Sequence, residues 1–420
     1  MIDIKLLRDD PAAIRKAIKN RGSKIDIDEV IRLDEERRGL QKQVDDRRAL
    51  KNQVGEKIAK ASASEKKKLV SGMKEFDLEQ DKMEKELAVV DKKFQIVFSQ
   101  IPNIPLPDVP VGKDEKGNVV AREVGKKPKF DFEPKSSLEI GEALDIIDTA
   151  RAAKVSGTRF GYLKNEAVLL EFALVRYALD TLIPEGFEPV LPPVLVREKT
   201  MWAMGFLDQH TEEIYKIDGE DQRLIGTSEQ SVIPMHMDEI LEGGDLPRRY
   251  VAFSTCFRRE AGSYGKDTKG ILRVHQFDKV EMLVLTVPSA SEAEHRFLVS
   301  LQERLMTGLK LPYRVVNLCT GDFGAPSART IDIETWIPSE NRYRETHSAS
   351  TTTDFQTRRL NIRCRPEGSG KLEFCHALNA TAFTGRALIA ILENYQEKDG
   401  SVTVPEVLRK YCGFERIGPR

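Results

Sequence analysis

The sequence predicts an α+β fold in which a long antiparallel coiled-coil hairpin precedes a domain built on an antiparallel β-sheet flanked by helices. Three observations lead to this prediction. A proline-free heptad pattern fills residues 28–98, a proline-rich segment follows it, and strand-like runs occupy 250–340 before a late apolar helix. Strands that follow one another, with helices elsewhere, favour an antiparallel sheet over a β-α-β arrangement.

The hairpin is predicted from two heptad seams around one short turn. The stronger seam alternates steps of four and three, which is typical of a coiled coil. Its members are Leu69, Met73, Phe76, Gln80, Met83, Leu87, Val90, Phe94 and Val97. A weaker seam occupies 30–58, and Ser64 is the expected N-cap of the second helix. With about 33 residues per helix and about 1.5 Å per residue, the arm would be roughly 50 Å long.

The far half of this arm is basic, although the whole chain has a net charge of −1. A near-neutral protein is not a globally basic nucleic-acid binder, so any such contact must be local. A solvated coiled-coil face would explain the charges, and a phosphate-contacting arm would explain them as well. The candidate tRNA-binding residues of the arm are Arg47, Arg48, Lys51, Lys57, Lys60, Lys66, Lys67 and Lys68.

The remaining chain is organised around the proline-rich exit from the arm at 101–110. Four prolines there exclude a helix, so we expect domains at 1–110 and 111–420. The second domain is long enough for a sizeable core. Its clearest elements are expected to be helices at 167–182 and 384–395, an extended segment at 189–196, and strands at 250–253 and 276–287.

Composition excludes several classes of protein. The N-terminus has no apolar signal region and no run approaches the ~18–20 apolar residues of a membrane span, so a cytoplasmic location without a membrane partner is expected. Five cysteines occur without a C-x-x-C pair, which favours buried reduced thiols and no zinc site.

Three separated segments carry polar residues that an ordinary core would not hold, at 225–230, at 256–282, and at 345–350 with 378–381 and Arg386 after it. Arg258 directly follows a strand, where its guanidinium could grip a carboxylate or phosphate. Glu260 and Glu281 lie beside or within apolar strands, where a carboxylate is costly unless a cation or donor meets it.

Other side chains in these segments fit a bound nucleotide. Phe277 offers a flat face for a base, and Arg386 follows a glycine at a helix start, where it could hold a second phosphate. Glu345 and Ser348 could supply oxygens to Mg²⁺. Each residue alone also fits a structural role, such as a surface ion pair or a core ring. Their combination on adjacent strands favours a site for an anionic small molecule.

Three ordered motifs carry a resemblance to a known family. Residues 186–193 read GFEPVLPP, residues 250–285 contain Phe257-Arg-Arg-Glu260 and, further on, Gln276-Phe-Asp-Lys-Val-Glu281, and residues 378–396 read LNATAFTGRALIAILENYQ. They resemble motifs 1, 2 and 3 of class II aminoacyl-tRNA synthetases, specifically the seryl-tRNA synthetase family of the common, non-zinc type. The hairpin resembles this family's tRNA-binding arm, so the resemblance covers essentially the whole chain. It implies a tRNA-binding domain followed by a class II catalytic domain.

The resemblance also implies roles for single residues. Arg258, Arg386 and Glu345 would be catalytic, and Glu345 and Ser348 would hold Mg²⁺ with ATP. ATP would bind at Arg258, Arg259, Glu260, Val274, Phe277, Glu345, Thr346, His347, Ser348 and Arg386. Serine would bind at Thr227, Ser228, Glu229, Arg258, Glu281, Asn379 and Thr381. The motif 2 loop would contact tRNA through Lys266, Lys269 and Arg273, in addition to the arm.

The activity that the resemblance implies is formation of seryl-adenylate and pyrophosphate from L-serine and ATP, then transfer of serine to the 3′ end of tRNA-Ser and, where present, tRNA-Sec. Motif 1 implies a two-fold homodimer. Two alternatives stay open. A diverged paralogue that loads a carrier protein would be expected to lack the arm. A catalytically silent tRNA-binding paralogue would be expected to have lost Arg258, Glu260 or Arg386, all of which are present.

Overall fold

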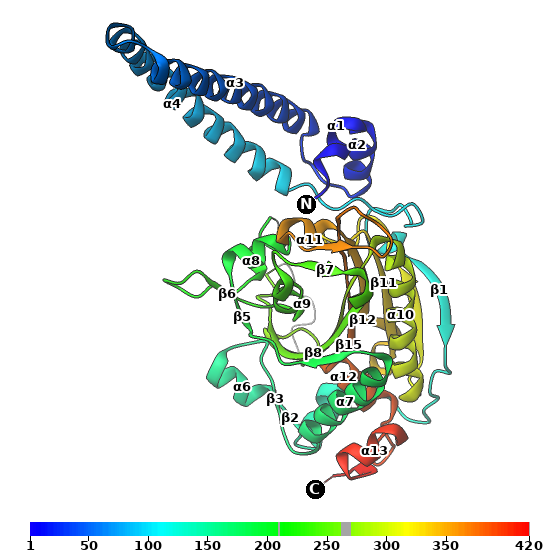
Figure 1. Ribbon diagram of the computed structural model, residues 1–420. Coiled ribbons are helices and arrows are strands. Elements are labelled where there is room, and N and C mark those ends of the chain that lie inside the picture. Colours follow the sequence, from blue (N-terminus) through cyan, green and yellow to red (C-terminus); the bar gives the residue numbers. More distant parts are fainter. Residues whose placement is uncertain (209–210, 262–269, 420) are drawn as a thin grey trace. The chain divides into compact units, whose positions relative to one another are not determined.

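The computed structural model describes residues 1–208, 211–261 and 270–419 (Figure 1). Its internal contacts divide the chain into two compact units. One unit is Asp3–Pro102, and the other is Asn103–Arg420 together with Met1–Ile2. Each unit is described by itself below.

The first unit consists of helices, as the heptad pattern predicts. The helices are α1 (Ile4–Asp9), α2 (Pro11–Asn20), α3 (Ile27–Lys60) and α4 (Ala63–Ser99). Helices α3 and α4 form the hairpin. The expected cap at Ser64 is wrong, because Ser62 caps α4 in a reciprocal capping box with Glu65. Ser62 has a glutamate three positions later, whereas Ser64 is followed there by Lys67, which cannot accept the backbone N–H.

The hairpin is held by its seam and by polar pairs across it. Val44, Val90 and Phe94 are buried, and Gln80 takes its place in the seam with only 7% of its surface exposed. Ion pairs join the two helices further out, among them Arg47 with Glu79 at 2.9 Å. Such half-exposed pairs each contribute little to stability, but together they specify an antiparallel register.

The second unit is built on an eight-stranded sheet in the order β1-β10-β11-β12-β15-β9-β8-β4 (Figure 1). Its strands are β1 (Val119–Val124), β4 (Glu188–Val190), β8 (Arg248–Phe257), β9 (Gln276–Thr286), β10 (Tyr313–Asn317), β11 (Arg329–Ile337), β12 (Arg342–Thr353) and β15 (His376–Thr384). All neighbours are antiparallel except β4 and β8, which are parallel. The predicted α+β architecture is therefore confirmed, with one parallel edge that the sequence pattern did not indicate.

Helices cover one face of this sheet. They are α7 (Glu166–Leu182), α10 (Ser291–Gly308) and α12 (Gly385–Asn394), and α13 (Glu406–Cys412) packs against α7. On β9 the even-numbered Val280, Met282 and Val284 pack into this core, because alternate side chains of a strand point to opposite faces. The odd-numbered residues of β9 therefore belong to the other face, where the polar residues of the motifs gather.

Smaller elements complete the unit. The short helices are α5 (Ser137–Ala143), α6 (Thr149–Ser156), α8 (Glu198–Ala203), α9 (Glu229–Val232) and α11 (Phe355–Leu360). The short strands are β2 (Ile147–Asp148), β3 (Tyr162–Leu163), β5 (Leu195–Arg197), β6 (Gln222–Leu224), β7 (Ile240–Glu242), β13 (Arg363–Arg365), β14 (Glu373–Phe374), β16 (Val402–Thr403) and β17 (Arg416–Ile417). Helices α8 and α9 pack with β7 and β13 around a second apolar cluster on the face opposite α7.

Three chemical features of the described residues bear on the sequence analysis. All five cysteines are free thiols, and four of them are buried. Within the described ranges, no three or more His, Cys, Asp or Glu side chains gather as a metal site would require. None of the helices in the described part of the chain has the length and apolar character needed to cross a membrane.

Candidate active site

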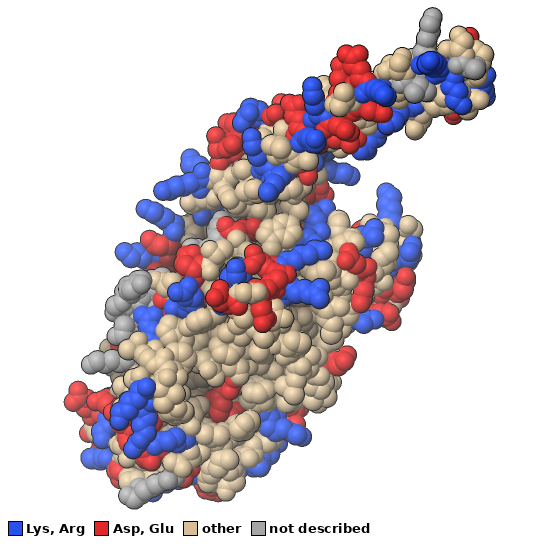
Figure 2. Space-filling view, turned by 90° about the vertical axis from the view of Figure 1, so that its left-hand side faces the viewer, with Lys and Arg blue, Asp and Glu red and all other residues tan. Residues whose placement is uncertain are grey.

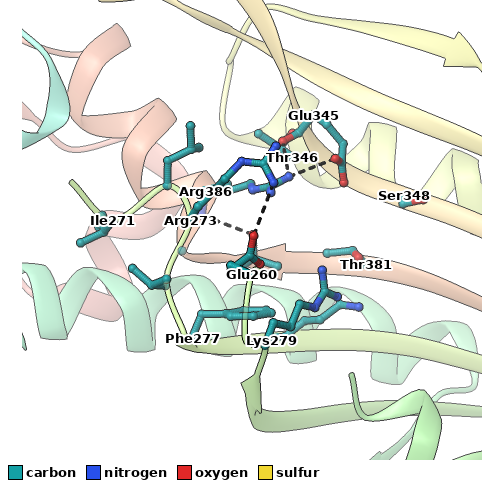
Figure 3. A pocket seen from close by; sticks show the side chains of 15 residues that line it. Glu260, Ile271, Arg273, Phe277, Lys279, Glu345, Thr346, Ser348, Thr381 and Arg386 are labelled. Atoms are coloured by element: carbon teal, nitrogen blue, oxygen red, sulfur yellow. Dashed lines mark hydrogen bonds and ion pairs between the residues drawn. The ribbon is translucent and has the colours of Figure 1, made fainter. Parts of the chain in front are cut away.

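A cavity of about 120 Å³ lies on the sheet face that the helices leave open (Figure 3). It brings together the end of β8, the start of β9, the middle of β12, and the junction of β15 with α12. Its lining residues are Arg258, Glu260, Ile271, Leu272, Arg273, Val274, Phe277, Lys279, Glu345, Thr346, Ser348, Thr381, Thr384, Gly385 and Arg386. Residues from the two motif-bearing stretches after position 250 thus meet in one place with Glu345, Thr346 and Ser348.

Two arginines face this cavity from different elements. Arg258 directly follows β8, its Nε donates to the carbonyl of Gly226 at 3.2 Å, and its guanidinium lies 5.2 Å from the centre of the Phe277 ring. Arg386 is in the first turn of α12, where the Thr384 hydroxyl accepts from its backbone N–H at 3.3 Å. Both cations are anchored through the backbone or a ring and keep donors for an anionic ligand.

Glu345 is the partner of Arg386. The Nη1 atom of Arg386 lies 3.2 Å from Oε2 of Glu345 and donates to the Glu345 carbonyl at 2.9 Å. Burial alone would raise the pKa of Glu345, but the charge and hydrogen bond of Arg386 outweigh it and hold that pKa below its usual value. Glu345 is therefore ionised at neutral pH and available to a cation.

The donor set around Glu345 fits a hard divalent cation. Glu345 and Ser348 both line the cavity. Ser348 is hydrogen-bonded to Asp332 on the neighbouring strand, and Oδ1 of Asp332 is buried without a hydrogen-bond partner among the described residues. Mg²⁺ takes one or two carboxylates and completes its shell with water and substrate phosphates. The oxygens present here agree with that preference.

Glu260 sits at a strained turn at the cavity wall. Its φ of 48° is in the left-handed region, which non-glycine residues seldom adopt. Such strain persists where the surroundings hold it, and here the Glu260 carbonyl accepts from Arg159 at 3.0 Å and its carboxylate lies 3.5 Å from Arg273. The turn aims the Glu260 carboxylate at the cavity, as Figure 3 shows.

The deeper end of the site contains a buried cross-strand pair. Glu281 on β9 and Thr381 on β15 are register partners, so their side chains lie side by side on the open face. Lys279, two residues before Glu281 on the same face, forms an ion pair with it and donates to the Thr227 hydroxyl at 3.2 Å. The lysine thus joins the 225–230 segment to β9 and compensates the buried Glu281 charge.

A second buried carboxyl lies beside this pair. Glu229 accepts from Nε2 of Gln356 at 2.6 Å and is also hydrogen-bonded to Asn379. Burial raises the pKa of Glu229 to about 7, and the nearby charge of Glu281 acts in the same direction. A carboxyl with this pKa is half ionised at neutral pH and gains stability from a bound cation.

Several predicted ATP and serine residues lie outside the cavity lining, namely Arg259, His347, Thr227, Ser228, Glu229, Glu281 and Asn379. Arg259 is exposed, and its backbone N–H donates to the carbonyl of Glu213. His347 is buried on the helix-covered side, where it meets Phe383 edge-on and burial lowers its pKa to about 4. Ser228 is fully buried behind Thr227 and Glu229. A contact from His347 to ATP would therefore have to come from its backbone.

The sequence reasoning missed two residues that organise the site. Lys279 could have been found, because it shares the period-two face of Phe277 and Glu281 on one strand. Gln356 carried no local signal. It is on α11, between the 345–350 stretch and motif 3, and only tertiary packing places its amide against Glu229.

The candidate tRNA residues are placed as follows. Lys266, Lys269 and the side chain of Lys68 lie outside what the structure describes. Arg273 lies in the cavity wall beside Glu260 rather than on an outer surface, so its tRNA contact stays a prediction. In the arm, three basic side chains pair with acidic residues of α4: Arg47 with Glu79, Arg48 with Glu84 and Lys51 with Asp77. The other four are exposed near the tip: Lys57, Lys60, Lys66 and Lys67.

Comparison with known proteins agrees with this geometry. Residues 1–105 match the Seryl-tRNA synthetase N-terminal domain, and residues 213–395 match the tRNA synthetase class II core domain (G, H, P, S and T). The chain is 43% identical over 425 residues to a serine–tRNA ligase of Dictyoglomus turgidum and 45% identical over 422 residues to one of Acidothermus cellulolyticus, with 100% of each chain covered.

Solved structures show the same likeness. The crystal structure of seryl-tRNA synthetase from Pyrococcus horikoshii complexed with ATP aligns with a TM-score of 0.93 and 42% identity over 100% of both chains. The cytoplasmic serine–tRNA ligase of Naegleria fowleri in complex with AMP aligns with a TM-score of 0.87 and 34% identity, covering 100% of this chain and 99% of that one. The chain belongs to the seryl-tRNA synthetase family of class II aminoacyl-tRNA synthetases.

Proposed function

We propose that this chain is a serine–tRNA ligase, which joins L-serine to ATP as seryl-adenylate and then transfers the serine to tRNA-Ser. The observation that carries this proposal is the buried Glu281–Thr381 pair, of which Thr381 lines the same cavity as Arg258 and Arg386. A small polar pocket and a phosphate grip side by side suit an amino acid that reacts at the α-phosphate of ATP. The full-length relatives support this function and not the carrier-protein or silent alternatives.

The first step needs no side-chain nucleophile. The serine carboxylate attacks the α-phosphate in line, a new oxygen–phosphorus bond forms, and the bond to the leaving pyrophosphate breaks. We assign Arg258 to the α-phosphate and serine carboxylate, Arg386 to the γ-phosphate, Phe277 to stacking on adenine, and Glu260 to its amino group. Catalysis then consists of positioning and of stabilising negative charge by two fixed cations.

Mg²⁺ would be held by Glu345 and Ser348 together with ATP oxygens, and it would neutralise phosphate charge. The 3.2 Å ion pair between Glu345 and Arg386 compensates both side-chain charges, and Arg386 would contact the γ-phosphate of ATP beside this site.

The second step uses tRNA. A terminal ribose hydroxyl attacks the seryl carbonyl, and AMP leaves. We propose that the arm binds the long variable arm of tRNA-Ser through its exposed tip lysines, and that tRNA-Sec, where present, is a second substrate. Figure 2 shows Lys and Arg side chains at the described end of the arm. The acceptor end would reach the motif 2 loop.

Specificity for serine follows from polar pairing. Glu281 and Thr381 can both bond the substrate hydroxyl, whereas alanine would leave them buried and without a partner. A site that loses such a bond discriminates strongly, so no separate editing activity is required against alanine.

The proposed function is tested by amino-acid-dependent ATP–pyrophosphate exchange with serine, threonine, alanine, glycine and cysteine in parallel. We expect serine to give the highest kcat/KM, with alanine at least about 100-fold lower because of the unpaired polar groups. Equal exchange with alanine and serine, or none with serine, would refute it.

Activation of serine should depend on pH through Glu229. We assign its carboxylate to the serine ammonium, which stays protonated throughout the range. Since the pKa of Glu229 is raised to about 7, its charged form is lost as pH falls through that value. We expect kcat/KM for serine to drop by up to about tenfold per pH unit below 7. kcat/KM for ATP, measured at saturating serine, should not fall in this way below pH 7. If kcat/KM for serine stayed constant between pH 6 and 8, that result would contradict the assignment.

We also propose that the enzyme is a two-fold homodimer built on motif 1. Large apolar side chains are exposed around that motif: Leu191 is 79% exposed and Ile183 is 45% exposed. The described surface in Figure 2 also includes a broad area with few charged side chains. Monomers seldom leave such surfaces uncovered. Sedimentation at micromolar concentration should give twice the 47.5 kDa chain mass, and a monomer would contradict the proposal. The expected cytoplasmic location stays a prediction.

A further inference from the structure

A second cavity, of about 410 Å³, backs onto the active site from the helix-covered side of the sheet. It is lined by residues of α6, α7 and β3 and by the ends of β8 and β9 that meet near Phe277. Phe277 and Asp278 are consecutive on β9, so their side chains start toward opposite faces. Phe253 and Thr255 on β8 share the face of Asp278, since Thr255 is its register partner. None of the residues assigned to serine lines this cavity.

Aromatic side chains form part of the walls of this cavity. Five rings line it: Phe160, Tyr162, Phe172, Phe253 and Phe277. Phe172 and Tyr162 are partly exposed, at 59% and 44%, so the cavity opens to the surface between them. The face of an aromatic ring carries partial negative charge and attracts a cation. A volume of this size is within the range of small-molecule sites.

Two carboxyl groups interrupt this apolar lining. Asp278 accepts from the Thr255 hydroxyl at 2.6 Å. Oε2 of Glu171, on α7, is buried and has no hydrogen-bond partner among the described residues. Burial, together with the charge of Asp278, raises the pKa of Glu171 to about 7. An unpartnered buried carboxyl oxygen is costly, and no described cation contributes to its environment.

We propose that this cavity is a binding site for a small aromatic primary amine, with its ammonium between Glu171 and Asp278 and its ring among the aromatic side chains. An ammonium group has three donors, enough for the unpaired oxygen of Glu171 and the free lone pairs of Asp278. Its charge would compensate both carboxylates. A neutral ligand could supply a hydrogen bond but no compensating charge, and an anionic ligand would be repelled by both carboxyl groups, so the charge of the site favours the amine.

A ligand bound in this cavity should affect the binding of the nucleotide in the active site. Ile271, Val274, Phe277 and Gly385 line both cavities, so a bound amine contacts the back of the wall to which we assign adenine. A ligand there restricts the Phe277 ring to its present position and should lower the KM for ATP. By linkage, ATP must then raise the affinity for the amine by the factor by which the amine raises the affinity for ATP.

Binding is tested on the full chain with 2-phenylethylamine as the probe, by calorimetry and by ligand-observed NMR. The matched neutral probe is 2-phenylethanol. We expect the alcohol to bind at least tenfold more weakly than the amine. Glu171→Gln keeps the shape of the side chain and should weaken the amine at least tenfold while leaving the alcohol unchanged. Val168→Phe should fill the cavity and abolish binding of both probes. Melting temperature and serine-dependent exchange report whether each variant is folded.

Several outcomes would overturn the proposal. Equal affinity for amine and alcohol, or no effect of Glu171→Gln, would reduce the site to an apolar cavity. A structure of the homodimer in which a cation of the partner subunit pairs with Glu171 would show that the chain itself fills it. An unchanged KM for ATP at saturating amine would remove the link to the nucleotide. Because binding is read without turnover, failure here is distinguishable from failure of the ligase activity.

Discussion

Replacing Glu281 by alanine is expected to lower serine-dependent ATP–pyrophosphate exchange by at least about 100-fold. The change removes the carboxylate assigned to the serine hydroxyl and leaves the buried Lys279 ammonium with Thr227 alone. A 100-fold loss is about 2.7 kcal/mol, within the range for losing a charged hydrogen-bond partner in a buried site. The measurement is kcat/KM for serine at saturating ATP.

Two further variants serve as controls for this experiment. Glu373→Ala, at an exposed glutamate on β14, should leave exchange unchanged. Lys279→Met alone should also have impaired exchange. The free-energy loss in the double variant with Glu281→Ala should be smaller than the sum of the losses in the two single variants, because the pair acts as a unit. Near-normal exchange by Glu281→Ala would remove its assigned role. Strict additivity would show that Lys279 does not act through Glu281.

Removing the arm is expected to separate the two half-reactions. Deleting residues 41–87 and joining the cut ends with a short Gly-Ser linker should leave adenylate formation within about twofold. Every residue that lines the active-site cavity belongs to the other compact unit, which supports that expectation. kcat/KM for tRNA-Ser should fall at least about 100-fold, since several phosphate contacts disappear together.

A variant that changes only the charge of the intact arm distinguishes a role of the arm in binding tRNA from a purely structural role. Changing the four exposed lysines near the tip to serine (Lys57, Lys60, Lys66 and Lys67) should raise the KM for tRNA-Ser at least about tenfold and leave exchange unchanged. The matched control replaces Arg47, Arg48 and Lys51, which pair with α4 and should affect melting of the arm more than tRNA binding. Full serylation by the deletion variant at low tRNA concentration would mean that the arm is structural only.

Much of the fold was predictable because its strongest signals are local. A heptad seam specifies which sides of α3 and α4 meet, and the apolar runs at 250–253 and 276–287 mark β8 and β9. The parallel pairing of β4 with β8 has no such signal, since the direction of an edge strand depends on the path of the chain between them. Strand β1 was also missed, because its Val-Val-Ala-Arg-Glu-Val sequence is exposed and carries mixed polarity.

The site was partly predictable for the same reason. Arg258, Glu260, Phe277 and Arg386 occur at strand ends or a helix start, where sequence position alone indicates an accessible side chain. The role of Gln356 depends on a contact between α11 and Glu229, 127 positions apart. The inward side chain of His347 follows from strand alternation, which the motif resemblance does not consider.

Strand β9 presents Phe277, Lys279 and Glu281 to one face, whereas Asp278 and Met282 belong to the other. Its side-chain period is two, so a shift of one residue would exchange the faces completely. A single-codon insertion or deletion inside β9 would bury a lysine and a glutamate against α7 and α10 and place Met282 where serine binds. Such frame-preserving indels should behave as null alleles, whereas the exposed Gln276 at the strand's first position should accept many substitutions.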